Sequence, residues 1–219
     1  MDTKNTLTPK TICKGMITMK SKNNLFFLTL SAVFIAIIAV MTLTPIGYLK
    51  FGIIEITLIA IPVAFGGTLL GKWGGLLLGT AFGVSSFIQC FGASAFGATL
   101  LSISPVKTFL VCMLPRMALG FFSAWIFEVM SKKVNVSVSG IVSFLSAAII
   151  NTVGFVGLLA VFFYKTEYIQ SIAEQLGATN ILMFAALFAG TNAVVEAIAC
   201  GACGSFLAPL SKKLKSQVR

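Results

Sequence analysis

The stretch that decides the fold reads IPVAFGGTLLGKWGGLLLGTAFGVSSF from Ile61 to Phe87. It consists of two apolar runs joined at Gly71-Lys-Trp-Gly74, and Lys72 is its only charged residue. The corner approaches the spacing of a phosphate-binding loop, but Trp73 stands where a hydroxyl would bind Mg²⁺ and no predicted strand precedes it. We therefore interpret it as a tight turn between two helices, with Lys72 as a basic anchor.

The composition of the whole chain agrees with these apolar runs. Of its 219 residues, 58% are hydrophobic and 10% are charged, whereas a soluble domain carries roughly 25% charged residues. So little charge cannot cover a surface that faces water, and the chain is predicted to be an integral membrane protein. The net charge of +10 comes from lysines at the ends of apolar runs, a pattern typical of membrane orientation rather than of nucleic-acid binding.

Six apolar runs have about the ~20 residues that a helix needs to cross a bilayer. They predict an all-α integral membrane protein, a bundle of six transmembrane helices at 25–44, 55–70, 74–91, 105–130, 137–164 and 181–210. This bundle, residues 25–210, forms one substrate-binding domain. Residues 1–24 are predicted to be a disordered basic tail and 211–219 a second basic tail. The run that begins at Leu25 is too long for a cleaved signal peptide, so we interpret it as an anchor.

Lysine and arginine placement predicts the orientation. The N-terminal tail, the corner at Lys72, the loop at Lys132 and Lys133 and the C-terminal tail all fall on one side of the predicted bundle. The positive-inside rule makes that side cytoplasmic, in a bacterial plasma membrane, with both termini inside. The outer loops, 94–104 and 165–180, are the longer ones. They form either a lid over an outward-facing site or ordinary connectors.

Several kinds of chemistry are excluded. The chain has no histidine, and Asp2 is its only aspartate, so histidine bases, Ser-His-Asp triads and histidine metal sites are absent. Cys200-x-x-Cys203 has the spacing of a redox motif without its context, and we interpret both cysteines as small apolar residues of a helix. The sequence predicts neither an enzyme nor a cofactor or metal.

The polar residues inside the predicted helices are the strongest functional signal. A charge at the bilayer centre costs roughly 2.5–3.5 kcal/mol, so such residues usually mark functional or paired sites. Arg116 and Asn192 lie about 16 Å from the outer ends of their helices, and Asn151 lies about 20 Å down its own. Glu196 follows Asn192 by one turn.

Two interpretations of this polar layer stay open. In one, Arg116 and Glu196 form a structural ion pair. In the other, Arg116 offers its guanidinium to a carboxylate in a pocket open to the outside. Gln89, Phe91 and Ser94 would then supply a lid and further contacts, although plain loop packing explains these three equally well.

Small residues recur at every fourth position along several of the predicted helices. Such stripes allow close helix contact in lipid, and most of them are expected to be internal. A stripe that faces lipid would instead be a docking surface for another membrane protein. The stripes are Gly67, Gly71, Gly75, Gly79 and Gly83; Ala32 and Ala36; and Ala185, Ala189, Ala193 and Ala197.

The motifs together resemble a known family. Residues 61–87, Leu114-Pro-Arg-Met-Ala-Leu-Gly120, Asn151-Thr-Val-Gly154 and Asn192-Ala-Val-Val-Glu196 resemble, in order, the second to sixth helices of substrate-binding (S) components of energy-coupling factor (ECF) vitamin transporters. The resemblance covers residues 25–210. It implies a six-helix protein that binds a vitamin near the outer face, joins a transmembrane coupling subunit and two cytoplasmic ATPases, and topples to release the vitamin inside. It also implies that Ala32 and Ala36 meet the coupling subunit.

The substrate is less sharply indicated. Gln89-Cys-Phe-Gly92 and Pro115-Arg116 are similar to the pantothenate-type branch, and an arginine suits a carboxylate vitamin, while riboflavin, folate and other vitamins stay open. The alternatives from other classes are a membrane scaffold subunit and a stand-alone secondary carrier. A carrier would be expected to show internal repeats and coupling-ion carboxylates, for which Glu196 is the sole candidate deep in a span.

Overall fold

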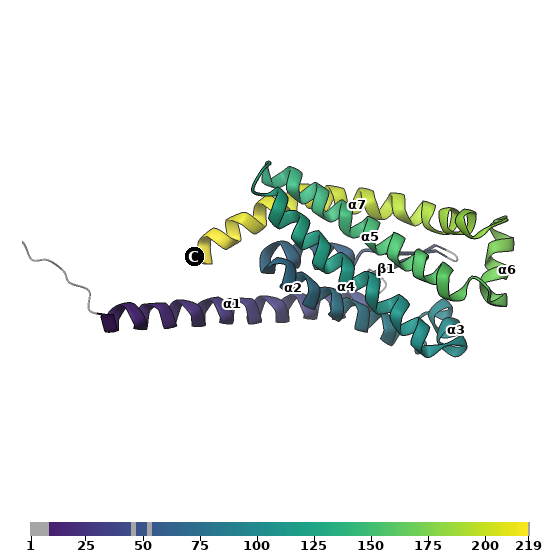
Figure 1. Ribbon diagram of the computed structural model, residues 1–219, viewed down its shortest axis with the longest axis horizontal. Helices are drawn as coiled ribbons and strands as arrows, with labels where there is room; N and C mark the ends of the chain where they lie inside the picture. Colours follow the sequence, from purple (N-terminus) through teal and green to yellow (C-terminus); the bar gives the residue numbers. More distant parts are fainter. Residues whose placement is uncertain (1–8, 45–46, 52–53, 219) are drawn as a thin grey trace, which may run out of the picture.

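The computed structural model describes the backbone of residues 9–44, 47–51 and 54–218, and side chains within 25–44, 47, 57–190, 193–211 and 213–214. The start of α1 and the C-terminal end of α7 lie at one end of the bundle, and β1, α3 and α6 lie at the other (Figure 1). The elements are α1 (Pro9–Leu43), β1 (Tyr48–Phe51), β2 (Ile54–Thr57), α2 (Ala60–Gln89), α3 (Ala95–Ile103), α4 (Pro105–Met130), α5 (Val136–Phe163), α6 (Glu167–Gln175) and α7 (Ile181–Val218).

The helical membrane architecture is confirmed in its main outline. Within the described residues, five helical segments are long and apolar enough to cross a membrane, and 181–190 of α7 is a shorter apolar stretch. The predicted range 105–130 coincides with α4, and 137–164 differs from α5 by one residue at each end. Within the described residues, α1 begins at Pro9, inside the predicted tail 1–24, and α7 continues into 211–219 as far as Val218. Proline is tolerated in the first turn of a helix, where its missing N–H costs no hydrogen bond.

The predicted helix 55–70 is wrong at its beginning. Residues 54–57 form β2, which pairs antiparallel with β1 in the register Tyr48↔Thr57, and α2 begins only at Ala60. Ile54-Glu-Ile-Thr57 alternates apolar and polar residues, the period of a strand rather than of a helix. The hairpin closes the connection between α1 and α2 at the end of the bundle that carries α3.

The predicted corner at Gly71 is confirmed within α2. Gly71 has φ 81° and ψ −178°, a backbone conformation that interrupts the helix and that glycine adopts without strain. A Cβ atom on Gly67 would lie 3.5 Å from Cα of Gly75, although eight residues of straight helix span about 12 Å. The two arms of α2 therefore fold back on each other. The carboxylate of Glu128 accepts a hydrogen bond from the N–H of Lys72 at 3.0 Å and caps the second arm.

The glycine stripe of α2 packs against α4. A Cβ atom on Gly75 would collide with the carbonyl oxygen of Gly120, and one on Gly79 would collide with that of Arg116. Only glycine allows the two backbones to approach this closely. The stripe is internal packing, and it places the second arm of α2 directly beside the helix turn that carries Arg116.

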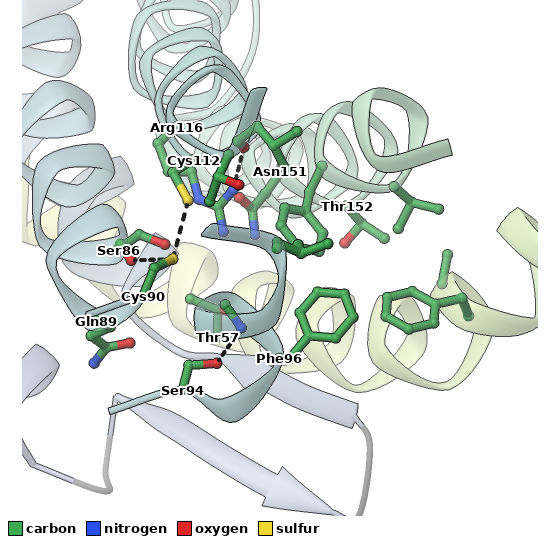
Figure 2. Close-up of a pocket in the computed structure, with 18 of the residues that line it drawn as sticks. Thr57, Ser86, Gln89, Cys90, Ser94, Phe96, Cys112, Arg116, Asn151 and Thr152 are labelled. Atoms are coloured by element: carbon green, nitrogen blue, oxygen red, sulfur yellow. Dashed lines mark hydrogen bonds between the residues drawn. The ribbon is translucent and has the colours of Figure 1, made fainter. Parts of the chain in front are cut away.

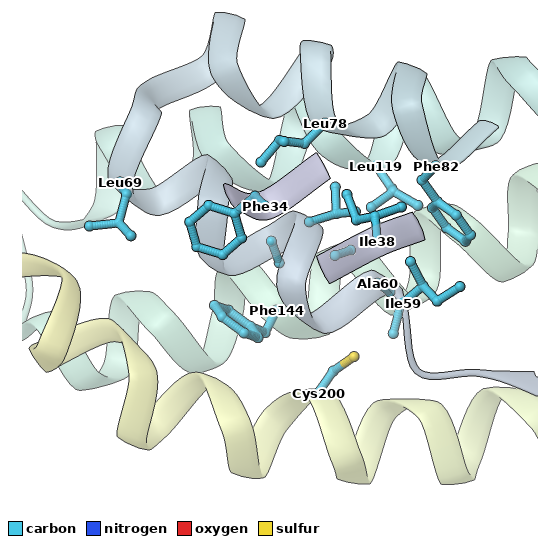
Figure 3. Close-up of a cluster of buried hydrophobic side chains, with 14 residues drawn as sticks. Phe34, Ile38, Ile59, Ala60, Leu69, Leu78, Phe82, Leu119, Phe144 and Cys200 are labelled. Carbon is cyan, nitrogen blue, oxygen red and sulfur yellow. The ribbon is translucent and has the colours of Figure 1, made fainter. Parts of the chain in front are cut away.

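The main hydrophobic core lies between the two arms of α2 and the helices α1, α4, α5 and α7. Phe34 and Ile38 enter it from α1, Phe82 from α2 and Phe144 from α5 (Figure 3). Cys200 of α7 is 1% exposed and points into the same cluster. This position agrees with its interpretation as a small apolar residue.

The two long connections predicted as loops contain helices. In α6, Ile169 and Ile172 are buried at helical spacing against Phe163 of α5 and Phe184 of α7, in a second core at that end of the bundle. The shorter α3 begins at a Ser94 cap whose side chain accepts a hydrogen bond from the N–H of Gly97 at 3.2 Å. Both connections are therefore structured covers of this end.

Candidate functional site

A cavity opens among the helices at the end that carries α3. Its empty space, counted out to the mouth and including open solvent, is about 910 Å³. In Figure 2, Arg116, Cys112 and Asn151 lie along one side of it, and Ser94 and Phe96 along the other. The lining comprises Thr57, Ser86, Gln89, Cys90, Ser94, Phe96, Gly97, Leu100, Thr108, Val111, Cys112, Arg116, Asn151, Thr152, Phe155, Val156, Phe188, Ala189 and Glu196.

Arg116 supplies the positive charge of the cavity. It is 5% exposed, and its guanidinium carbon lies 4.8 Å from the ring centre of Phe155 and 5.6 Å from that of Phe82. Nη1 donates a hydrogen bond to the carbonyl oxygen of Val111 at 2.9 Å. Nε is buried and has no hydrogen-bond partner among the described residues. A guanidinium between aromatic rings keeps its donors in a fixed plane.

Glu196 supplies a carboxylate that neutral donors hold. Asn151 Nδ2 and Thr152 Oγ1 each donate to one of its oxygens, both at 3.2 Å, and the residue is 3% exposed. Although Arg116 and Glu196 both line the cavity, no ion pair joins them in the described part of the chain. The structure therefore does not contain the Arg116–Glu196 ion pair that one of the two interpretations predicts. Asn151 Oδ1 is also buried without a partner among the described residues.

The opposite wall is aromatic and polar. Gln89 Nε2 donates to the carbonyl oxygen of Thr42 at 2.7 Å, which ties the end of α2 to α1. Phe96 of α3 packs against Tyr168 of α6 and Phe188 of α7, with 5.9 Å between ring centres in each pair. The three helices α3, α6 and α7 thus close this side of the cavity.

Five of the seven side chains predicted from the sequence line this one cavity. Phe91 does not: it is 68% exposed and packs edge-on against Phe87. The side chain of Asn192 lies outside the described residues. The five are Gln89, Ser94, Arg116, Asn151 and Glu196.

The prediction missed other lining residues. Cys90 and Cys112 meet in the wall with 3.9 Å between their sulfur atoms, and they carry no spacing signal because they belong to different helices. Thr57 is at the end of β2, a strand that was predicted as helix. Phe155 follows Asn151 by one helical turn, so a search for residues on the face of Asn151 would have found it.

A multi-pass helical bundle with a buried arginine beside a cavity is typical of a membrane protein that handles a solute. The chain matches the family of the ECF transporter, substrate-specific component, over residues 26–204, and it belongs to that family. No curated protein matches the chain. It is therefore a multi-pass membrane protein that serves as the substrate-binding subunit of an ECF transporter. Members of this family are binding subunits and not enzymes, and they work with the other subunits of an ECF complex.

Proposed function

We propose that this chain binds a carboxylate-bearing vitamin or vitamin precursor, pantothenate in the first place, and delivers it to an ATP-driven import complex. The complex would comprise a transmembrane coupling subunit and two cytoplasmic ATPases. Six of the seven site residues predicted from the sequence, all except Phe91, are part of this proposal, with Arg116 as the residue that binds the carboxylate.

One observation carries the choice of ligand. Arg116 Nε and Asn151 Oδ1 are both buried, both without a partner among the described residues, and both belong to residues that line one cavity. An unsatisfied buried polar group costs about 1–3 kcal/mol, more when it is charged. A ligand that presents an anionic acceptor to Arg116 and an N–H or O–H donor to Asn151 removes both costs. Pantothenate carries a carboxylate, an amide N–H, two hydroxyl groups and an apolar dimethyl carbon that suits the phenylalanines of the wall.

The proposed topology has six crossings and places both termini in the cytoplasm. The folded-back α2 supports this number, because its two arms replace one long span by two antiparallel ones. The start of α1, the turn between α4 and α5 and the end of α7 lie at the same end of the bundle (Figure 1). That end carries Lys132, Lys133 and the C-terminal lysines, so the positive-inside rule makes it cytoplasmic. The cavity then opens to the outside.

The proposed docking face for the coupling subunit is the Ala32–Ala36 stripe. Both alanines are exposed on α1, whereas Phe34 and Ile38 of the same helix point into the core. The glycine stripe of α2 packs against α4 inside the molecule. The alanine stripe is exposed, so it can pack against a helix of another protein.

The test is mass spectrometry of the small molecule that the chain retains after mild detergent purification, followed by titration of the emptied chain with that molecule. We expect a carboxylate, and pantothenate to bind with a stoichiometry of one. Recovery of a ligand without an acidic group would contradict the carboxylate assignment. A chain that neither retains nor binds any small molecule would contradict the binding function and favour a scaffold subunit.

A further inference from the structure

The sequence Pro115-Arg116 places a proline inside α4 immediately before the arginine of the cavity. In a regular helix the N–H of residue 115 would donate to the carbonyl oxygen of Val111, four residues earlier. Proline has no N–H, so this carbonyl group is left without its normal donor. An unpaired carbonyl inside an apolar bundle costs free energy unless another donor reaches it.

The donor that reaches it is Arg116 itself. Its Nη1 donates to the Val111 carbonyl oxygen at 2.9 Å. Because a guanidinium is planar and rigid, one fixed nitrogen limits the positions of the other two. The side chain folds back along its own helix, and Nε stays buried without a partner beside the cavity. The rings of Phe155 and Phe82 hold the plane of the guanidinium.

Two neighbouring helices present glycines to Pro115 and Arg116, and this allows close packing. Pro115 is buried, and a Cβ atom on Gly154 of α5 would lie 3.0 Å from Cβ of Pro115, closer than an ordinary contact. On the other side, Gly79 of α2 contacts the backbone of Arg116. The proline ring is therefore packed against α5, and the backbone of Arg116 is packed against α2.

We propose that Pro115 is a positioning residue for the ligand. Because Pro115 has no N–H, the Val111 carbonyl oxygen is free to accept the hydrogen bond from Arg116 Nη1. This contact fixes the guanidinium and orients its remaining N–H groups toward the ligand. The inference rests on the proposed function only for the identity of the ligand. The Pro115–Val111–Arg116 relationship itself exists without one.

The experiment compares Pro115→Ala and Pro115→Ser with a matched control, Pro209→Ala. Both changes at Pro115 restore an N–H for Val111 and release Nη1. Pro209 is a proline inside α7, exposed and outside the cavity lining, so its replacement reports the general effect of removing a helix proline. The chain contains only two arginines, Arg116 and Arg219. Labelling of arginine with ¹⁵N therefore gives just two guanidinium groups to follow by NMR.

We expect hindered rotation and slow proton exchange at the Arg116 guanidinium in the wild-type chain, and loss of both in the two Pro115 variants. Their affinity for pantothenate should fall by about ten- to a hundredfold, the effect of one hydrogen bond to a charged group. The Pro209 variant should change neither quantity. Unchanged Arg116 signals in the Pro115 variants would overturn the inference, as would released signals with wild-type affinity. If the wild-type chain binds no pantothenate, the choice of ligand fails, while the NMR comparison still decides whether Pro115 holds Arg116.

Discussion

Asn151 and Glu196 are joined across α5 and α7 by a hydrogen bond of 3.2 Å from Nδ2 to Oε1. The hydroxyl of Thr152 donates to the second oxygen of the same carboxylate. The carboxylate of the cavity is therefore held by two neutral donors on one helix. Within the described residues, no ion pair joins it to Arg116. This division of partners is the reason to assign Arg116 to the ligand.

Two glycines of α2 allow a matched test of how Arg116 is placed. Gly79→Ala and Gly75→Ala each press a methyl group onto a carbonyl oxygen of α4, at Arg116 in the first case and at Gly120 in the second. Both variants should lose stability by about 1–3 kcal/mol, the usual cost of overpacking. Only Gly79→Ala should also weaken ligand binding strongly, because it displaces the turn that carries the guanidinium.

Thermal unfolding in detergent and titration of the ligand measure the two effects separately. Equal losses of affinity in both glycine variants would mean that helix packing as a whole, and not the place of Arg116, determines binding.

The contact between Cys90 and Cys112 predicts a specific cross-link. In a chain whose other three cysteines are replaced by serine, mild oxidation should join these two sulfur atoms, because they already lie 3.9 Å apart and a disulfide needs about 2 Å. The product should be a monomer without free thiols. A matched chain that retains only Cys112 and Cys200 should stay reduced, and cross-linking of both chains alike would contradict the described end of α2.

The six-crossing topology predicts which loops face the outside. A single cysteine introduced into residues 165–180, in a chain without its native cysteines, should react with a membrane-impermeant maleimide in intact cells. One introduced after Ser211 should react only after the membrane is opened. The reverse pattern would place the cavity on the cytoplasmic side.

The exposed alanines of α1 predict a separation of binding from transport. Ala32→Trp or Ala36→Trp should keep helices of a partner apart, so uptake and co-purification of the coupling subunit should fall while the isolated chain still binds its ligand. Ile37→Trp, at an exposed position about 100° around α1 from Ala36, is the control. Loss of ligand binding with the complex intact would show that the stripe serves internal packing.

The sequence alone was sufficient for the long helices and for the polar layer, for clear physical reasons. Pro105 begins α4 and the apolar length sets its end, so depth along the helix could be counted to Arg116 and related to Asn151 and Glu196. The hydrogen-bonding partner of Glu196 could not be predicted by counting residues along a helix. Whether Glu196 pairs with Arg116 or with Asn151 depends on side-chain geometry between helices, which spacing within one helix does not contain.

The short elements were missed for a different reason. The strands of the β1–β2 hairpin have four residues each, and α3 and α6 have nine. Helices of this length are marginal on their own and depend on tertiary packing, as Ile169 and Ile172 of α6 show by their burial. The sequences of α3 and α6 therefore resemble loops until the rest of the bundle is present, whereas β2 was included in a predicted helix.

The most direct test of the central claim is isothermal titration of four chains with the retained ligand: wild type, Arg116→Ala, Arg116→Lys and the double variant Arg116→Ala with Glu196→Ala. Loss of one partner of a buried charged contact costs about 2–5 kcal/mol, or roughly 30-fold to several thousandfold in affinity. We predict this loss in Arg116→Ala, little recovery in Arg116→Lys because the planar fork is gone, and no recovery in the double variant. Near-normal affinity in the double variant would contradict the account, because it would show that Arg116 serves only to neutralise Glu196.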